Sequence, residues 1–375
     1  MVSNSSQQRS RCESAENNWH LRSFRTRITT KKNMMLGKLT NKPRFSQFKG
    51  QSHTCTHLEA ISIGSTASRR ICKQGRIGKV QSVFRRAFNI ITPDNRLISV
   101  VQEDLGRGPI NIVTKAPNSI TMISIGIQTD NEVARVDDQI IVGNNILTVS
   151  TKNAKKWKPR NRFQDKLLTI EKIIDNLNVM KEMVSSHDRI HGLSKLVEYV
   201  CEERLEKNYD GHRLSPYARM VLPRISMLQK AIRTGNSQDI ERSAEKLIGL
   251  GPGLTPAADD MLSGMMVSMT ILAKNMQGHT HAKADLVSRI NRDIIDSVEG
   301  RTTLISQEFL MNAAAGEANE PIITLVEKVL TGEPNEVQNA TEAVLQIGAT
   351  SGADTVLGIL LGSKLLLNKH AAWEA

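Results

Sequence analysis

The chain has 375 residues, of which 39% are hydrophobic, 23% are charged and only 3% are aromatic. This composition is typical of a folded protein of two or three domains, and so few aromatic side chains argue against a protein that stacks the bases of single-stranded nucleic acids. The four cysteines are widely spaced with no C-x-x-C pair, and no apolar stretch reaches the roughly 20 residues of a transmembrane helix, so we expect a cytoplasmic protein that neither relies on disulfides nor binds a membrane.

The formal net charge of +12 is concentrated near the N-terminus. Residues 1–50 hold eleven basic and two acidic side chains, whereas the remaining residues hold 39 basic and 36 acidic ones. We interpret residues 1–57 as a disordered basic leader, with Met34 or Met35 as the initiator, so that residues 1–33 need not belong to the native protein. An organellar transit peptide and a nucleic-acid-binding arm are the less favoured alternatives.

The next segment, residues 58–150, is rich in short β-branched runs separated by turn residues, and it shows no competing amphipathic helix. We predict a small antiparallel β-domain here, a barrel or a sandwich. The expected strands are Val80–Ile91, Leu97–Val101, Ile110–Val113, Ile120–Ile125 and Gln139–Val149.

Residues 151–163 are polar and basic, which predicts a linker, and from residue 164 the apolar residues recur with helical periodicity. We therefore predict an all-helical domain over residues 164–375 and an α+β protein as a whole. We expect Pro223 to kink or end one helix. After a first helix near Leu167–Val184, the expected helices are 191–207, 216–234, 237–249, 257–275, 282–299, 302–315, 321–331, 335–347 and 353–369.

The segment Gly249–Asp260 reads GLGPGLTPAADD and carries the strongest chemical signal. Its glycines, Gly251 and Gly253 among them, predict a tight loop whose amides can bind an anion such as phosphate. Thr255 is placed as an N-cap, and Asp259 and Asp260 in the first helical turn. Because two carboxylates would repel a bound phosphate, either a divalent cation such as Mg²⁺ or a shared proton is needed. The simpler alternative is a well-capped buried helix.

A second segment, Gly348–Leu357, matches Gly253–Leu262 at five positions with a constant offset of 95 residues. Ser351 and Asp354 have the spacing of a capping box. One hypothesis is that the two loops face each other and form a single site, and the other is that two similar helix starts arose independently. Gly358 and Gly362, four residues apart, predict close helix packing. The candidate binding residues of this segment are Thr350, Ser351 and Gly352.

Between these loops lies Glu299–Ser306, which contains Arg301 and Thr302. The guanidinium of Arg301 suits a carboxylate or a phosphate, and Thr302 and Ser306 would share a helical face with it. An arginine exposed to solvent is the alternative. The run His53–His57 has ligand-type side chains at alternate positions but no evident fourth ligand, so we treat it as adventitious.

The stretch Gly249–Leu262 resembles the signature G-L-G-P-G-L-T-P-S-G-D-D of the AllH family. The resemblance continues through Gly300–Thr303 and Gly348–Asp354, and it includes Gly78–Ile91 and Trp157–Pro159. It implies a subunit of oxamate carbamoyltransferase that acts with FdrA-like and AllG-like subunits in allantoin degradation. That enzyme interconverts oxalurate plus phosphate and oxamate plus carbamoyl phosphate. Ala257 and Ala258 stand where Ser-Gly is usual, which puts one hydroxyl contact in doubt.

The first hypothesis is therefore an enzyme subunit in which Asp259, Asp260 and Asp354 orient an amine, act as a base or hold Mg²⁺, while loop amides and Arg301 bind the anion. Whether a metal is needed is open. The second hypothesis is a non-catalytic assembly subunit whose loops shape a partner's active site. The third and weakest is nucleic-acid binding through the basic leader.

Overall fold

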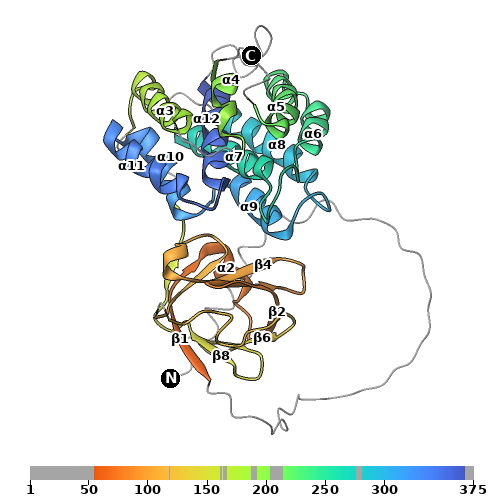
Figure 1. The fold of residues 1–375 in the computed structure, drawn as a ribbon, viewed down its shortest axis with the longest axis vertical. Helices are drawn as coiled ribbons and strands as arrows, with labels where there is room; N and C mark the ends of the chain where they lie inside the picture. The colour runs from red at the N-terminus through yellow and green to blue at the C-terminus, as the bar shows by residue number, and fades with distance from the viewer. Residues whose placement is uncertain are drawn as a thin grey trace, which may run out of the picture.

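The computed structural model describes residues 55–117, 119–160, 163, 167–186, 192–202, 214–275 and 281–367. It has a strand-rich domain and a helical domain stacked along the long axis of the molecule (Figure 1). Most of the predicted basic leader lies outside the described residues, although its last two residues, Thr56 and His57, already belong to the first strand. No helix in the described part of the chain has the length and apolarity to cross a membrane.

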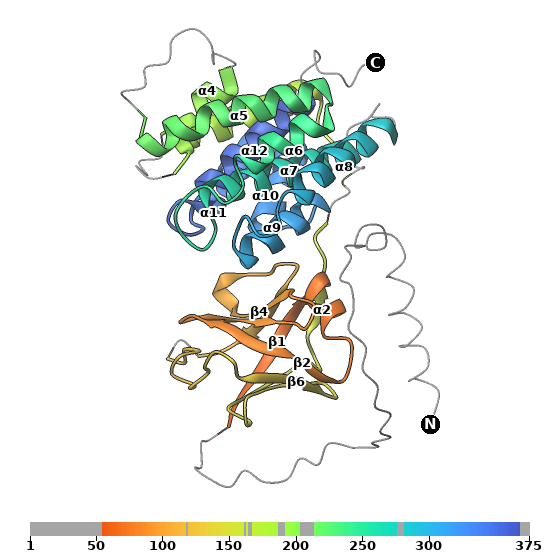
Figure 2. The ribbon, with the colours of Figure 1, turned by 90° about the vertical axis from the view of Figure 1, so that its right-hand side faces the viewer.

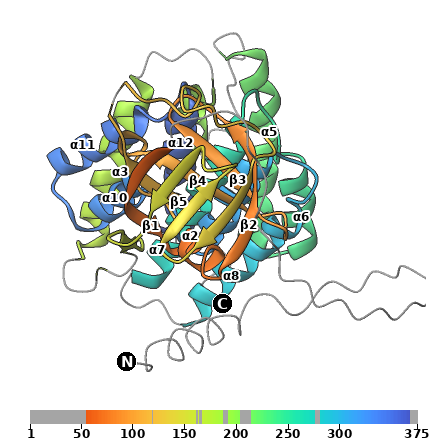
Figure 3. The ribbon, with the colours of Figure 1, turned by 90° about the horizontal axis from the view of Figure 1, so that it is seen from below.

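The N-terminal domain is a closed barrel, which confirms the predicted fold class. Its strands follow the order β5-β4-β3-β2-β6-β7-β8-β1, and β1 pairs with β5 to close it (Figure 3). Most pairs are antiparallel, but β1–β8 and β4–β5 are parallel. The strands are β1 (Thr56–Gly64), β2 (Gly75–Val83), β3 (Ala87–Ile91), β4 (Leu97–Gln102), β5 (Asn111–Lys115), β6 (Glu132–Val136), β7 (Gln139–Val142) and β8 (Leu147–Ser150).

Three of the predicted strands in this domain are wrong. Neither Val80–Ile91 nor Gln139–Val149 is one strand, because a turn at residues 84–86 separates β2 from β3 and a turn at residues 143–146 separates β7 from β8. Ile120–Ile125 forms turns, because the side chains of Thr121 and Ser124 bond each other's backbone amides at 2.9 Å and so replace strand pairing. The predicted linker contains a short strand, β9 (Lys155–Trp157), which pairs in parallel with β1, and a short helix, α2 (Ser65–Arg70), follows β1.

The C-terminal domain is helical, as predicted. Four of its helices begin at a Thr, Ser or Asn whose side chain accepts a backbone N–H, namely Thr169, Ser215, Asn236 and Thr303. Pro223 lies inside α5 and does not end it. The helices are α3 (Ile170–Ser185), α4 (Val197–Glu202), α5 (Pro216–Thr234), α6 (Ser237–Glu245), α7 (Ala257–Asn275), α8 (His281–Asp296), α9 (Leu304–Ala314), α10 (Glu320–Thr331), α11 (Pro334–Leu345) and α12 (Ser351–Leu367).

Helices α7 and α12 form the centre of this domain, and nearly every residue of both is buried (Figures 1 and 2). They run parallel, since Gly358 lies against Met261 and Gly362, one turn later, lies against Met265. Glycine is required at this crossing because a Cβ on Gly358 would lie 1.9 Å from the carbonyl oxygen of Met261. The predicted close packing of Gly358 and Gly362 is therefore present, and it aligns the first turns of the two helices.

We expect Gly358→Ala to destabilise the helical domain by about 1–3 kcal/mol or more, because the added methyl group forces α7 and α12 apart. Chemical unfolding followed by circular dichroism measures the change. Asn339→Ala is the control, because Asn339 is exposed on α11 and alanine favours a helix there. Equal stability of the Gly358→Ala variant and the wild type would contradict the close crossing.

The barrel and the helical domain contact each other through α9 and α10. Glu308 of α9 is ion-paired with Arg70 of α2 and with Arg96, both at 2.9 Å. Its carboxylate also accepts the amide N–H of Leu97 at 3.0 Å. The amide of Glu320 donates to the carbonyl oxygen of Arg107 at 2.9 Å. A buried carboxylate therefore joins the two domains, and it sits one turn into the helix that follows Arg301 in the chain.

Candidate functional site

The glycine-rich loop before α7 is built as the sequence predicts. Gly249, Gly251 and Gly253 have φ angles of 78°, 123° and 101°, which side-chain-bearing residues rarely adopt. A Cβ on Gly249 would also lie 2.2 Å from the carbonyl oxygen of Arg301. Helix α7 begins at Ala257, where the carbonyl of Pro256 accepts the amide N–H of Asp260 at 3.1 Å. The predicted helix 257–275 therefore begins where expected, but Thr255 lies one residue before the N-cap position.

Asp259 joins this loop to the segment before α9. One carboxylate oxygen accepts the amide N–H of Gly249 at 2.8 Å, and the other accepts the hydroxyl of Thr302. Burial raises the pKa of Asp259, and these hydrogen bonds oppose that rise. Since both oxygens are used within the chain, the geometry gives Asp259 a positioning role.

The two predicted loops meet through Thr255 and Ser351, whose hydroxyl oxygens are 3.1 Å apart. The hydroxyl of Thr255 also donates to Asp260 at 3.1 Å. The loop before α7 is thus bonded to the first turn of α12, across 96 residues of sequence. This contact brings the candidate residues of both segments into one cluster.

Asp354, in the first turn of α12, is fully buried. Its Oδ1 accepts the amide N–H of Leu193 at 2.6 Å, and its Oδ2 has no hydrogen-bond partner within the described residues. The predicted capping box is wrong, because α12 begins at Ser351 and Asp354 bonds to a distant loop instead. Burial raises the pKa of Asp354 to about 7, and the amide of Leu193 and the hydroxyl of Thr350 oppose that rise.

Asp260 is the third carboxyl group of this cluster. Burial raises its pKa well above the ordinary value, and the charge of Asp354 raises it further, while hydroxyl bonds oppose the rise. Burial thus disfavours the charged form of Asp260, and Asp354, with a pKa of about 7, exchanges its proton at neutral pH, so the cluster carries fewer than three negative charges there. Within the described residues, no group of three His, Cys, Asp or Glu side chains is arranged to hold a metal ion. The sequence left two ways to reduce the repulsion between these carboxylates and a bound phosphate, a divalent cation or a shared proton. A proton shared between the carboxyl groups fits this arrangement.

Sequence reasoning missed Tyr217, at the start of α5. Its hydroxyl donates to the carbonyl oxygen of Leu250 at 2.7 Å, and a Cβ on Gly251 would lie 2.9 Å from that hydroxyl. Burial raises the pKa of Tyr217, and the charge of Asp354 adds to the rise. Nothing in the local sequence marks this residue, because it reaches the loop only through the packing of α5.

Arg301 and Thr302 are placed differently from each other. The guanidinium of Arg301 is half exposed and ion-paired with Glu245 at 2.7 Å. Thr302 lies before α9, which begins at Leu304 with Thr303 as its N-cap, so the predicted helical face shared by Thr302 and Ser306 is wrong. Thr303 instead donates to the carbonyl oxygen of Leu254 at 2.6 Å and so holds the loop from the other side.

Some of the remaining candidate binding residues pack against neighbouring elements, and others are exposed to solvent. Gly352 is buried against α11, where a Cβ would lie 1.9 Å from the carbonyl oxygen of Val344. Thr350 lies against Gly192, in the loop that bonds Asp354. The loop tip Pro252–Leu254 is exposed, and within the described residues the amides of Gly253, Leu254 and Thr255 donate no hydrogen bond. These amides are available to an anion at the start of α7.

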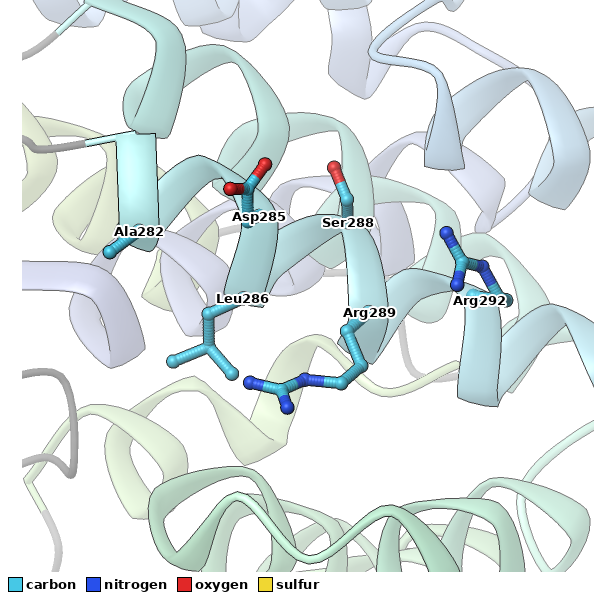
Figure 4. A pocket seen from close by; sticks show the side chains of 6 residues that line it. All are labelled: Ala282, Asp285, Leu286, Ser288, Arg289 and Arg292. Carbon is cyan, nitrogen blue, oxygen red and sulfur yellow. The ribbon is translucent and has the colours of Figure 1, made fainter. Parts of the chain in front are cut away.

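A surface hollow on α8 is separate from this cluster, and Figure 4 shows Leu286 and Arg289 pointing into it. None of its lining residues belongs to either loop: they are Ala282, Asp285, Leu286, Ser288, Arg289 and Arg292.

Comparison with known families matches both halves of the chain. The family model described as oxamate carbamoyltransferase subunit AllH matches residues 247–363, a range that contains both glycine loops and all three aspartates. The model described as the AllH family N-terminal domain matches residues 59–156, which span the barrel. No solved structure matches the chain. The chain belongs to the AllH family, and the family description makes it a subunit of an oxamate carbamoyltransferase.

Proposed function

We propose that the cluster formed by the two glycine loops transfers a carbamoyl group between oxalurate and phosphate. The observation that carries this proposal is the position of loop amides at the start of α7, free within the described residues, beside two buried carboxyl groups with raised pKa values, Asp260 and Asp354. The aligned first turns of α7 and α12 add their helix dipoles at the same place, which favours an anion. Oxalurate, oxamate, phosphate and carbamoyl phosphate are all anions.

The reaction needs a proton to move as bonds change. An oxygen of hydrogen phosphate attacks the carbamoyl carbon of oxalurate, and the bond from that carbon to the oxamate nitrogen breaks. The departing nitrogen gains one proton and the phosphate loses one, so a single carboxyl group that starts protonated can give its proton to the nitrogen and take the proton of the phosphate. A carboxyl group with a pKa near 7 is suited to this exchange at neutral pH, and Asp354 has that property. Asp260 and Thr255 would hold the reacting group beside it.

We place this activity in a complex with FdrA-like and AllG-like subunits in the cytoplasm, in a route that degrades allantoin. The resemblance supports this assignment, and the family description supports the part of it that makes the chain one subunit of an oxamate carbamoyltransferase. Mg²⁺ bound together with the substrate's own oxygens is compatible with the cluster, but the proposed proton transfer does not depend on it.

The proposal is tested with the three-subunit complex by measuring carbamoyl phosphate formed from oxalurate and phosphate. We expect Asp260→Asn and Asp354→Asn to lower kcat by about 100-fold or more, because Asp354→Asn removes the group that transfers the proton and Asp260→Asn removes a group that holds the reacting atoms beside it. In the wild type, kcat should fall as the pH rises through about 7, where Asp354 loses its proton. Asp293→Asn is the matched control, since Asp293 is a buried aspartate on α8 outside the cluster. Full activity in both site variants would overturn the assignment.

Arg301 requires its own control because it is ion-paired with Glu245. If Arg301 binds the substrate, Arg301→Ala raises KM and Glu245→Ala does not. Equal effects from the two variants would limit Arg301 to the surface ion pair.

A non-catalytic assembly subunit is the alternative function. The complete internal bonding of Asp259 and the ion pair of Arg301 favour it, because neither side chain is directed at a substrate. Calorimetry on the isolated chain with carbamoyl phosphate distinguishes the two: binding supports the enzyme subunit, and binding only in the complex supports assembly.

A further inference from the structure

One face of α5 is both apolar and exposed. Pro216, Met220, Pro223 and Met227 are spaced by four, three and four residues, so they form a single stripe along the helix. Met220 is 40% exposed and Met227 is 45% exposed, whereas the opposite face of α5 lies in the core. Figure 2 shows α5 along the outer surface of the helical domain, on the side away from the barrel. We refer to these four residues as the α5 stripe.

The charge on α5 has only one sign. The helix contains Arg219, Arg224, Lys230 and Arg233 and no aspartate or glutamate. Arg219 and Lys230 are exposed beside the stripe. Outside its basic N-terminus the chain is nearly neutral, so the positive charge around these exposed methionines is a local feature. It favours a binding partner that is apolar on one face and acidic at its edges.

The α5 stripe begins beside the candidate site. Tyr217, next to Pro216, donates its hydroxyl to Leu250, and the loop tip carries Leu254, which is 55% exposed. An occupant of the stripe would therefore lie close to the glycine loop and to the opening of the site.

We propose that the α5 stripe is the docking surface for an acidic amphipathic helix of a partner subunit. The inference rests on the proposed function, because it takes the partner from the carbamoyltransferase complex. Methionines adapt their shape to an incoming helix, and carboxylates at its edges pair with Arg219 and Lys230. A second copy of this chain fits poorly, since a two-fold contact would place the cations of one α5 against those of the other.

The test uses the full chain co-expressed with FdrA-like and AllG-like subunits. Light scattering after gel filtration and a titration of the purified partners measure the complex. We expect Met220→Glu with Met227→Glu to weaken assembly by about 100-fold, because buried anchors dominate such interfaces and the new carboxylates repel acidic neighbours. Arg219→Glu with Lys230→Glu should slow association and remove most of its salt dependence.

Helix α3 supplies a matched control. Ile170 and Ile174 are 46% and 43% exposed, four residues apart, but Glu171 and Asp175 accompany them. We expect Ile170→Glu with Ile174→Glu to leave assembly unchanged. All variants should melt within a degree or two of the wild type, because the replaced side chains are exposed; a large loss confined to the α5 variant would show that the stripe is covered within the chain and would overturn the proposal.

The remaining outcomes separate the two proposals. An active complex that the α5 variants leave intact overturns the docking surface and keeps the carbamoyl transfer. A complex that depends on α5 but forms no carbamoyl phosphate keeps the docking surface and overturns the reaction. A wild-type chain that remains alone beside these subunits, or a dimer of the chain that the α5 variants abolish, overturns the docking proposal.

Discussion

Replacing Asp354 with asparagine is expected to stabilise the protein above neutral pH and to flatten the dependence of its stability on pH. In the folded chain the pKa of Asp354 is raised to about 7, whereas an unfolded aspartate titrates near 4. Between these values the folded state holds a proton that the unfolded state has lost. The free energy of unfolding therefore decreases as the pH rises from about 4 to about 7, and the loss is complete above about pH 8.

Asparagine cannot ionise, and its amide oxygen can still accept the N–H of Leu193. The variant should match the wild type near pH 4 and exceed it by up to about 4 kcal/mol at pH 8.5, which corresponds to about three pKa units. Urea unfolding of the helical domain at pH 5.5, 7 and 8.5 measures the difference. Asp296→Asn, an exposed change on α8, should show no such gain. If the stability of the Asp354→Asn variant depended on pH as that of the wild type does, Asp354 would ionise normally in the folded chain.

Replacing Glu308 with alanine is expected to destabilise the protein by about 3–5 kcal/mol, because it leaves two partly buried arginines without a counter-charge. The side chain of Glu308 is 3% exposed and is ion-paired with Arg70 and Arg96, which are 14% and 24% exposed. Burial lowers the pKa of Arg70, and the charge of Glu308 opposes that effect. The amide of Leu97 also loses its acceptor.

Calorimetric unfolding tests this expectation, and the barrel and the helical domain should unfold further apart in temperature once Glu308 no longer joins them. Glu320→Ala is the control at the same interface, because Glu320 pairs with Arg107 while both are more than 40% exposed. Such an exposed pair contributes about 0–1 kcal/mol. Similar losses from the two variants would contradict the central role of Glu308.

The sequence was sufficient to predict the two kinds of domain, because the change from short β-branched runs to helical periodicity is a local property. The errors occur where local and distant interactions compete. Ile120–Ile125 has the composition of a strand, yet Thr121 and Ser124 bond the backbone between them. Lys155–Trp157 is too short and too basic to predict as a strand, and it becomes one only because β1 offers a free edge.

The sequence was sufficient to predict which segments form the site, but not which role each of their side chains has. The offset of 95 residues aligns Asp259 with Asp354, which suggests equivalent functions. In the structure Asp259 uses both oxygens within the chain, whereas one oxygen of Asp354 has no partner among the described residues. The partner that distinguishes them, Leu193, is 161 residues from Asp354, and no spacing rule connects the two. Tyr217 was missed for the same reason.

The parallel arrangement of α7 and α12 also constrains when the site can form during synthesis. Four helices, α8 to α11, separate the two halves of the cluster, so the ribosome must release α12 before Asp354 can approach Asp260. Until then the apolar face of α7 that packs against Gly358 and Gly362 has no cover, and such surfaces promote aggregation of nascent chains. Deleting α12 should therefore yield an insoluble protein rather than a folded one with weakened activity, and slow translation of residues 276–350 should lower the yield of folded chain.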